Sequence, residues 1–569
     1  MDTRLALVLA VVLLIRLPFL NQAIQGDDVY YLAGAEHAQI DPLDPNHVQY
    51  VSMGDRVDLR GFPHPPFNAW FLGLLLAVIG DIYEVPFHAA YILFSLVAAC
   101  AMWSLAKRFS PHPLWATLLF LAAPAFVING SSLESDLPFL AFWMASVACF
   151  VAGRWMWAAI AMVLAALSAF QAVFLTPILA VYVWIYWRKD RKARFAMLLT
   201  LVPPVALLVC QLFERWYSGT IPVAVSAGYM SSYGLQTLAN KVRNAAALAV
   251  HACFIVFPAL LPGAVLLAWK RRDRDTAFLG AWIALFFGGA ALLFFAGSAR
   301  YLLPMAAPVV LLVSRLRPRW LALGFAAQLA LSLALATVNY QHWDGYRRFV
   351  RQIRPATAGH RVYINSEWGL RYYLEADGGL PLERGQVLRT GDIVVSSELG
   401  YPIEYTAPTA TIAEQSIRAW LPLQLIGVKA RSGYSTATKG FRPFDISTAP
   451  IDIVRAAIVL DRHPALTYLP MSSPDAANQI VSGLYAVEGG AWRWMSGSAV
   501  VLLKSPAQPL PIEAVFTIPD AAPARHMELL LDGQVVASAT YPGPGAYTLK
   551  SPPQSPVGAS DFGIECVVC

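Results

Sequence analysis

The stretch FNAWFLGLLLAVIG, residues 67–80, decides how the chain is threaded. It has 14 residues, whereas a helix needs about 20 consecutive apolar residues to cross the hydrocarbon core of a bilayer. A length of this kind is typical of an interfacial or re-entrant helix. We therefore expect this stretch to lie at the membrane surface and not to span the membrane.

The composition of the whole chain is that of an integral membrane protein. Of its 569 residues 57% are hydrophobic and 14% are charged, and the mean hydropathy is +0.52, which lies outside the range of soluble globular proteins. The sequence predicts a polytopic α-helical membrane protein with about 11 transmembrane helices. The candidate spans are residues 5–20, 87–106, 113–129, 137–153, 155–169, 171–187, 195–213, 246–269, 277–296, 301–314 and 320–338.

The basic residues support the exclusion of residues 67–80 from these spans. All strongly basic loops then lie on one side, which the positive-inside rule assigns to the cytoplasm together with the N-terminus. The loop after the first span and everything after residue 338 lie outside, with Lys241 and Arg243 as basic exceptions. The net charge of +6 comes from these short loops, which excludes a nucleic-acid partner. We expect the protein to lie in a bacterial inner (plasma) membrane.

The pattern of the chain changes near residue 340, which divides it into residues 1–340 and 341–569. Pro and Gly then punctuate alternating stretches such as RVYIN, GDIVVSS and MELLLDGQVVASA, which read as strands. The last stretch carries Asp532–Gly533, which predicts a hairpin turn. The stretch SEWGLRYYLEADGG predicts a helix capped by Ser366 and closed by its glycines. We expect a soluble extracytoplasmic domain that is α/β or rich in β-strands.

Two adjacent aspartates, Asp27 and Asp28, follow Gly26 in the first external loop and precede a short helical stretch. A carboxylate at a helix start often caps the helix and is favoured by the helix dipole. Capping needs only one of the two, so the pair also indicates chemistry in the water at the membrane surface.

Further polar residues are predicted at the same surface. His64 precedes the Pro65–Pro66 pair at the start of the interfacial helix, where it is structural or helps to bind phosphate or a metal. Glu134 and Asp136 lie in the very short second external loop. A second acidic loop at the surface that already holds Asp27 is less easily explained by capping alone.

Arg300 and Tyr301 lie at the outer end of a late span. An arginine there either snorkels to the headgroups or donates paired hydrogen bonds to a lipid phosphate. Gln171, His251 and Arg16 also map near outer span ends, and for each a structural role is favoured. Gln171 and His251, like Glu134 and Asp136, are also candidates for binding an acceptor or a metal.

The sequence leaves metal dependence open. Asp27, Asp136 and His64 would suit a divalent metal, but their spacing does not prove such a site. The terminal CxxC formed by Cys566 and Cys569 has no second cysteine pair, which argues against a zinc or redox site there.

In this order and on this side of the membrane, the features resemble those of the GT-C glycosyltransferases. They are an acidic pair after the first span, a PP motif before an apolar helix, an acidic second loop and RYLLP near the last spans. The resemblance covers roughly residues 1–340 and is nearest to the dolichyl-phosphate-mannose protein mannosyltransferases of glycosyltransferase family 39 and to the bacterial aminoarabinose transferases that modify lipid A.

The resemblance implies a role for several residues. It makes Asp27 the catalytic carboxylate, with Asp28 beside it where relatives usually carry Glu. It makes Asp136 the acidic residue of the second loop and Arg300 the ligand of the lipid phosphate. His64 stands where some relatives carry Glu or Lys, so metal binding of the aminoarabinose-transferase type is not implied. Protein mannosylation is not implied either, because the tail does not resemble the sugar-binding MIR module.

The activity implied is transfer of a sugar from a polyprenyl-phosphate donor to an extracytoplasmic glycan, lipid or protein acceptor, by an inverting displacement. Asp27 would be the general base, and Arg300, with help from His64, would stabilise the leaving phosphate. One alternative is a secondary transporter, which usually shows paired repeats and charges near the membrane midplane. Another is a catalytically inactive assembly subunit that keeps the same scaffold.

Overall fold

The structure is a computed structural model. It describes residues 2–62, 64–232, 234–235, 237–252, 254–256, 258–270, 273–294, 297–434, 439–462, 464–506, 508–531, 533–554 and 562–568, the last range and positions 259 and 268 without side chains. The terminal CxxC and Asp532 of the expected hairpin turn lie outside the described side chains.

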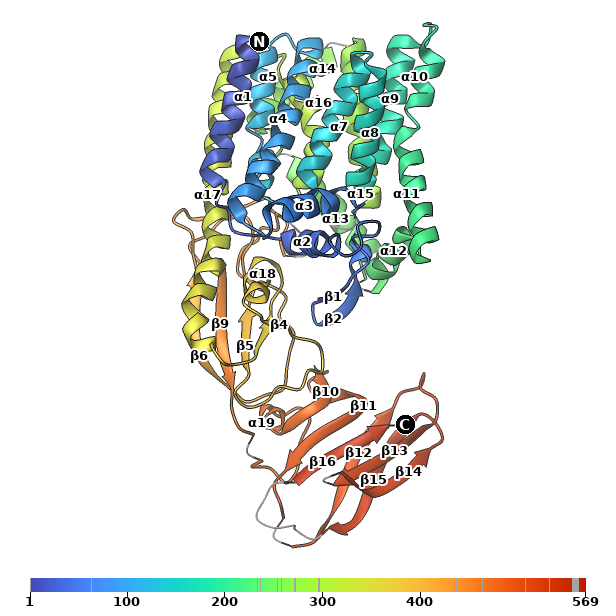
Figure 1. Ribbon diagram of the computed structural model, residues 1–569, viewed down its shortest axis with the longest axis vertical. Helices are drawn as coiled ribbons and strands as arrows, with labels where there is room; N and C mark the ends of the chain where they lie inside the picture. Colours follow the sequence, from blue (N-terminus) through green and yellow to red (C-terminus); the bar gives the residue numbers. More distant parts are fainter. Residues whose placement is uncertain are drawn as a thin grey trace.

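A bundle of roughly parallel helices forms one end of the molecule (Figure 1). Among the residues that the structure describes, five helical segments are long and apolar enough to cross a membrane: Glu84–Phe109, Phe170–Trp187, Ala193–Ser218, Arg274–Leu293 and Pro318–Thr357. Shorter apolar helices lie among them, and the expected number of about 11 spans stays a prediction. The bundle helices are α1 (Thr3–Arg16), α4 (Glu84–Phe109), α5 (Pro113–Leu121), α6 (Pro124–Asn129), α7 (Asp136–Val151), α8 (Trp155–Ser168), α9 (Leu175–Tyr182), α10 (Ala193–Leu199), α11 (Val202–Ser218), α14 (Leu261–Lys270), α15 (Arg274–Leu293), α16 (Leu303–Val313) and the first half of α17 (Pro318–Thr357).

Two helices, α2 (Asp28–His37) and α3 (Phe67–Ile79), lie across the end of the bundle (Figure 1). This is the position expected for residues 67–80. Glycine at position 73 allows the two helices to approach closely, since a Cβ there would lie 3.0 Å from the Cβ of Ala38. The outer face of α3 is apolar, since Leu74 and Val78, one helical turn apart, are 62% and 76% exposed. Helices α12 (Pro222–Ser232) and α13 (Leu238–Ala252) and the short hairpin of β1 (Gln49–Ser52) and β2 (Asp55–Asp58) lie at the same end.

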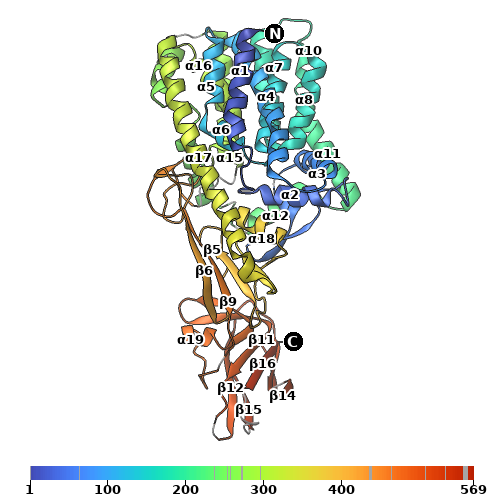
Figure 2. The same cartoon turned by 60° about the vertical axis from the view of Figure 1, so that its left-hand side comes forward.

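Helix α17 connects the bundle with the C-terminal region without a break at residue 340. It has 40 residues and is therefore about 60 Å long. Its second half packs closely on the first C-terminal sheet, where a Cβ on Gly345 would lie 2.8 Å from Ile417. A continuous helix of this kind fixes the C-terminal region relative to the bundle (Figure 2).

The C-terminal region contains two sheet assemblies (Figures 1 and 2). In the first, of order β4-β3-β5-β9-β6, β3 runs parallel to β4 and β5, and β9 runs antiparallel to β5 and β6. Its strands are β3 (Val362–Asn365), β4 (Leu380–Pro381), β5 (Ile393–Ser397), β6 (Thr409–Ile417) and β9 (Asp452–Val459), and α18 (Trp368–Ala376) follows β3. A small ladder of β7 (Leu423–Gln424) and β8 (Asp445–Ile446) lies between β6 and β9 in the chain.

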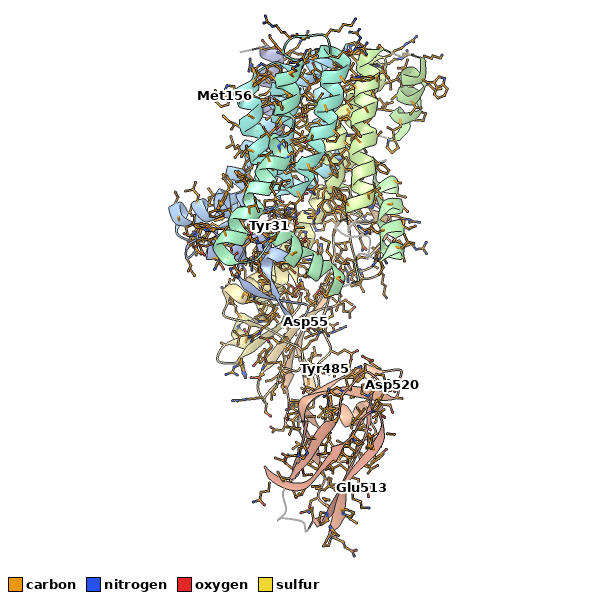
Figure 3. All side chains as sticks on the ribbon, turned by 90° about the vertical axis from the view of Figure 1, so that its right-hand side faces the viewer. Tyr31, Asp55, Met156, Tyr485, Glu513 and Asp520 are labelled. Carbon is orange, nitrogen blue, oxygen red and sulfur yellow. The ribbon has the colours of Figure 1, made fainter. Side chains whose placement is uncertain are left out.

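The second assembly is antiparallel and lies farthest from the bundle, where Figure 3 labels Tyr485, Glu513 and Asp520. It combines a sheet of order β10-β11-β16-β13-β14 with the pair β12-β15, and the short helix α19 (Pro474–Ala477) precedes it. The expected hairpin is present as β13 and β14. The strands are β10 (Ile480–Glu488), β11 (Trp492–Leu503), β12 (Leu510–Ile518), β13 (Arg525–Leu531), β14 (Gln534–Tyr541), β15 (Gly545–Gln554) and β16 (Phe562–Val568).

One detail of the C-terminal prediction is wrong. Ser366 does not cap α18, because Glu367 occupies the N-cap position and makes no capping hydrogen bond. The hydroxyl of Ser366 instead donates to the carbonyl of Glu367. The expected closure by glycine is present, since Gly378 follows the helix with φ +88°.

Candidate functional site

Arg300 brings together three carboxylates at the end of the bundle. It opens the 3₁₀ turn Arg300–Leu302 before α16, and its side chain is only 7% exposed. Its Nη2 donates to Oδ2 of Asp27 at 3.1 Å, and its Nη1 donates to Oε2 of Glu134. Oδ2 of Asp136 lies 3.7 Å from Nη1. The two acidic loops predicted at this surface therefore meet around one guanidinium.

Asp27 is the carboxylate of this cluster most open to solvent. Its side chain is 32% exposed, whereas that of Glu134 is 7% exposed. Its backbone N–H donates to Oε1 of Glu134 at 3.3 Å. Gly26 makes this approach possible, because it adopts φ +47° and a Cβ there would lie 3.1 Å from the same oxygen. Asp27 is thus held at the boundary between the buried ion pair and water.

Asp28 has a different environment, although it is adjacent in sequence. It is fully buried, and its carboxylate accepts hydrogen bonds from the backbone of Gln25 and Leu133 and from the hydroxyl of Ser132. Desolvation nevertheless raises the pKa of Asp28 to about 7. These bonds tie the start of α2, and with it the segment that carries Asp27, to the second external loop.

Capping does not explain the aspartate pair. Asp27 occupies the N-cap position of α2, but its side chain makes no capping hydrogen bond. The carboxylate of Asp28 accepts from residues outside the helix. Both side chains are therefore used for tertiary contacts.

His64 lies beside this cluster as part of a hydrogen-bonded chain. Its Nδ1 lies 2.7 Å from Oγ of Ser135, which in turn lies 3.2 Å from the hydroxyl of Tyr31. Desolvation, reinforced by the charge of Arg300, lowers the pKa of His64 to about 3. At neutral pH His64 is therefore an uncharged hydrogen-bonding group in this environment.

Arg300 keeps one hydrogen-bond donor unused. Its Nη2 also donates to the hydroxyl of Tyr301 at 3.0 Å, and its guanidinium lies 5.0 Å from the centre of that ring. Its Nε is buried and has no acceptor among the described residues. An unpaired buried donor is costly, so this N–H is a natural partner for an anionic ligand.

The other polar residues predicted near outer span ends do not join this cluster. Arg16 is buried and donates to Ser95 and to the carbonyls of Phe126 and Val127 near the end of α6, which is a structural role. Gln171 lies on the 3₁₀ turn Phe170–Phe174, and His251 lies buried on α13. Within the described part of the chain, neither hydrogen-bonds to Arg300 or its carboxylates.

The geometry does not fit a metal site. Among the residues that the structure describes, no group of three or more His, Cys, Asp or Glu side chains is arranged to hold a metal ion. The guanidinium of Arg300 already occupies the carboxylates of Asp27 and Glu134, and His64 is bonded to Ser135. Asp27, Asp136 and His64 are therefore not arranged as ligands of one metal ion.

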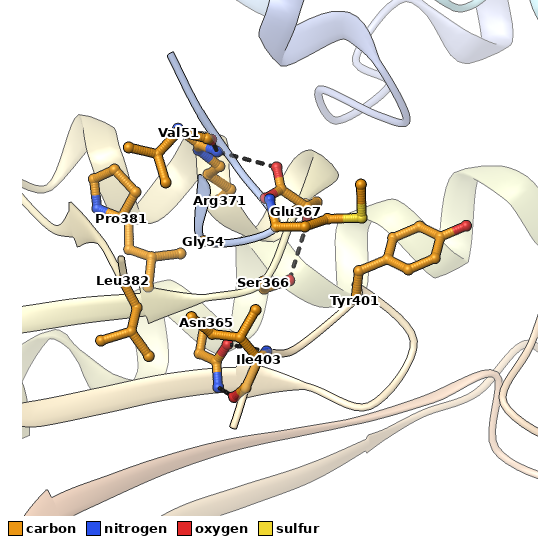
Figure 4. A pocket seen from close by; sticks show the side chains of 12 residues that line it. Val51, Gly54, Asn365, Ser366, Glu367, Arg371, Pro381, Leu382, Tyr401 and Ile403 are labelled. Carbon is orange, nitrogen blue, oxygen red and sulfur yellow. Dashed lines mark hydrogen bonds and ion pairs between the residues drawn. The ribbon is translucent and has the colours of Figure 1, made fainter. Parts of the chain in front are cut away.

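Contacts from α18 position the segment that carries Asp27, and sequence reasoning did not find them. The carboxylate of Glu367 accepts from the hydroxyl of Tyr30 at 2.9 Å and from the backbone of Met53 at 2.7 Å. The backbone N–H of Ile24 donates to the hydroxyl of Tyr373 at 2.9 Å. Figure 4 shows Glu367 in a small cavity where the β1–β2 hairpin meets the first C-terminal sheet. No local pattern signals these contacts, because their partners are more than 300 residues apart.

A second contact from the C-terminal region lies next to Arg300. The hydroxyl of Ser298 donates to the carbonyl of Tyr434, whose own hydroxyl donates to Asn129 at 2.7 Å. Tyr434 thereby joins the segment before Arg300 to the end of α6. The C-terminal region thus contacts the segments next to Asp27 and next to Arg300.

Comparisons with known proteins complete the description. No protein-family model matches the chain, and no curated protein matches its sequence. The structure is similar to that of ArnT from Cupriavidus metallidurans bound to undecaprenyl phosphate, with 14% sequence identity, a TM-score of 0.44 and coverage of 69% of this chain and 92% of that one. It is also similar to arabinofuranosyltransferase AftD from mycobacteria, with 13% identity, a TM-score of 0.42 and coverage of 100% and 58%. For the oligosaccharyltransferase of Archaeoglobus fulgidus in complex with zinc and sulfate, the values are 11%, 0.40, 99% and 98%. The function proposed below rests on the site itself.

Proposed function

We propose that the protein is a membrane glycosyltransferase of the GT-C type, which moves a sugar from a polyprenyl-phosphate donor to an extracytoplasmic glycan, lipid or protein. The observation that supports this most is the guanidinium of Arg300, set between Asp27 and Glu134 where α2 crosses the end of the bundle. A lipid-linked donor keeps its chain in the bilayer, so its phosphate lies at this depth. A phosphate-binding cation and a carboxylate base then meet where the sugar is attached.

Donor binding follows from the hydrogen bonds of Arg300. A guanidinium matches two oxygens of a phosphate with two parallel N–H donors. In Arg300 the Nε–H is free among the described residues, and Nη2 is held by Asp27, the most exposed of the three carboxylates. In our proposal the donor phosphate takes these two donors and releases Asp27, while Glu134 keeps its bond to Nη1.

The released Asp27 is then the general base. It takes the proton of the acceptor hydroxyl as that oxygen attacks the anomeric carbon. The bond from the anomeric carbon to the phosphate oxygen breaks, the electron pair stays on the phosphate, and Arg300 meets the growing negative charge. A single displacement inverts the anomeric configuration. The products are the glycosylated acceptor and the polyprenyl phosphate.

The neighbours of the pair adjust its charge. Three carboxylates surround one guanidinium, and their excess negative charge would by itself repel an anionic donor. With a pKa of about 7, Asp28 is partly protonated at neutral pH and adds little to that repulsion. His64 stays neutral and hydrogen-bonds with Ser135, so it supports the loop that carries Glu134.

The transporter alternative is less well supported. A transporter is expected to hold its charged residues near the middle of the membrane. Here the charged cluster lies where α2 crosses the end of the bundle, and Tyr434 of the C-terminal region contacts Ser298, two residues before Arg300. An assembly subunit without activity differs from the proposed enzyme only in turnover, which the following experiment measures.

The test compares envelope glycans and lipid-linked sugars, by mass spectrometry, from strains with and without the gene. We expect loss of one glycan substitution and accumulation of its lipid-linked donor. Wild-type protein and Asp55→Asn, an exposed aspartate of the β1–β2 hairpin, restore the modification, whereas Asp27→Asn does not. Full restoration by Asp27→Asn at equal protein level would overturn the catalytic role and support the inactive subunit.

A further inference from the structure

A segment of the C-terminal region returns to the end of the bundle. It comprises residues 418–434 and 439–446 and is called the interfacial segment below. Leu425 and Tyr434 of this segment pack in the same hydrophobic cluster as the bundle helices, and the ring of Phe444 lies 5.7 Å from that of Phe254. Figures 1 and 2 show it, in light orange, beside α17 at the level where α2 and α3 cross the bundle.

The position of the membrane boundary on α17 places this segment at the lipid surface. The apolar stretch 320–338 has 19 residues, so as a helix it is about 28 Å long and matches the hydrocarbon thickness of a bilayer. Gln341 lies three residues beyond, and its Oε1 accepts the backbone N–H of Trp420 at 2.9 Å. Trp420 is therefore held within one helical turn of the outer boundary.

The segment exposes large apolar side chains at this depth. Trp420 is 89% exposed and Ile446 is 72% exposed, and Leu421 beside Trp420 is also exposed. They belong to one small structure, because Leu423 pairs with Ile446 and the N–H of Ser447 donates to the carbonyl of Pro422. An exposed tryptophan in water is costly, whereas in the headgroup region its ring meets lipid and its N–H meets water.

The charge of the segment selects the lipid. Between residues 418 and 446 the sequence carries five basic residues and one acidic residue, Asp445. Asp445 accepts from the backbone of Arg431 and from the side chain of Arg442. Arg418, Arg431 and Arg442 are all exposed. Arg418 lies two residues before Trp420, Arg442 lies three residues before Asp445 of the ladder, and the backbone of Arg431 donates to that aspartate. Each basic residue near an anionic membrane surface strengthens the binding of the protein to that surface about fivefold.

We propose that the interfacial segment is a lipid-binding surface for anionic phospholipids of the outer leaflet. Trp420, Leu421 and Ile446 enter the headgroup region. Arg418, Arg431 and Arg442 contact the lipid phosphates. None of these six side chains belongs to the Arg300 cluster, and the proposal does not depend on the glycosyltransfer reaction.

The test uses a bimane fluorophore on Trp420→Cys in full-length protein whose six native cysteines are replaced. The protein is reconstituted in vesicles of phosphatidylcholine with or without phosphatidylglycerol. We expect strong quenching by lipids brominated in the upper acyl chain and weak quenching by aqueous iodide. The control Tyr485→Cys, an exposed residue that Figure 3 places far from the bundle, is quenched by iodide alone.

The same fluorophore reports the lipid preference. Brominated phosphatidylglycerol should quench more than brominated phosphatidylcholine, and the triple variant Arg418→Gln, Arg431→Gln, Arg442→Gln should lose this difference. Equal iodide quenching at positions 420 and 485 overturns the proposal, and so does shielding of position 420 from both quenchers, which indicates a protein partner. If the cysteine-free protein does not fold, Trp420→benzoylphenylalanine in the native chain gives the second measurement. Its photocrosslinks to lipid support the proposal, and crosslinks to protein overturn it.

Discussion

Variants of the buried ion pair between Arg300 and Glu134 can distinguish the structural role of the cluster from its role in sugar transfer. Both side chains are 7% exposed, and each is a main partner of the other. Arg300→Gln leaves Glu134 buried without its cation. Removal of one member of a buried ion pair costs about 3–5 kcal/mol. We therefore expect a clearly lower melting temperature and no sugar transfer for Arg300→Gln.

The double variant Arg300→Gln, Glu134→Gln gives the sharper test. Two neutral amides of similar size can hydrogen-bond to each other, so most of the lost stability should return. Sugar transfer should not return, because no cation remains to meet the leaving phosphate. The matched control is Arg56→Gln with Glu383→Gln, an exposed pair at 2.9 Å whose loss should cost below about 1 kcal/mol.

The assays are thermal unfolding in detergent and transfer of radiolabelled sugar from lipid-linked donors in membranes. Two results would refute the reasoning. If Arg300→Gln melts like the wild type, the cluster does not behave as a buried ion pair. If the double variant transfers sugar at the wild-type rate, Arg300 does not bind the donor phosphate.

Three further outcomes are expected. Asp27→Asn keeps a hydrogen-bond acceptor for Arg300, so its melting temperature should equal that of the wild type. Its transfer rate should fall by about 10²–10⁴-fold, whereas that of Asp55→Asn should not change. A rate of Asp27→Asn near that of the wild type would contradict its role as general base. The folded protein keeps the proton of Asp28 up to about pH 7, while the unfolded chain loses it near pH 4, so the melting temperature should fall as the pH rises through this window. Asp28→Asn should flatten that part of the profile, and an unchanged slope would assign it to other groups. Gly369→Ala should lower both the melting temperature and the transfer rate, because its Cβ would lie 2.3 Å from the carbonyl oxygen of Ile24, three residues before Asp27. The control Gly280→Ala would place its Cβ where no atom lies within 4 Å, so it should change neither.

The sequence predicted which polar residues lie at the end of the bundle, because that depends on local properties. The length of an apolar stretch determines whether it can span a bilayer, and 14 residues were enough to expect α3 as an interfacial helix. The charges of the loops then placed Asp27, Glu134 and Arg300 on one side. Strands β3, β5, β13 and β14 of the C-terminal region followed from alternation and turn residues in the same way.

Other features could not be predicted, because they depend on lateral packing. The bond between Asp27 and Arg300 joins residues 273 positions apart, and hydropathy does not say which loops become neighbours. The environments of Asp27 and Asp28 differ in spite of their adjacent positions, since only Asp28 is enclosed by Ser132 and Leu133. The sequence predicted Ser366 as the cap of α18, but its hydroxyl donates to the carbonyl of Glu367. The side chain of Glu367 in turn binds the distant residues Tyr30 and Met53.

The sequence by itself determined that this chain has a membrane-type helical part, an acidic surface beside it and a C-terminal part rich in strands, because hydrophobicity, charge and strand alternation are written along the chain. Only the tertiary structure decided that Arg300 joins the two acidic loops, that Asp27 is the carboxylate most open to water, and that α18 and Tyr434 contact the neighbouring segments. The physical reason is that an ion pair or a desolvated carboxylate is a property of several distant segments together.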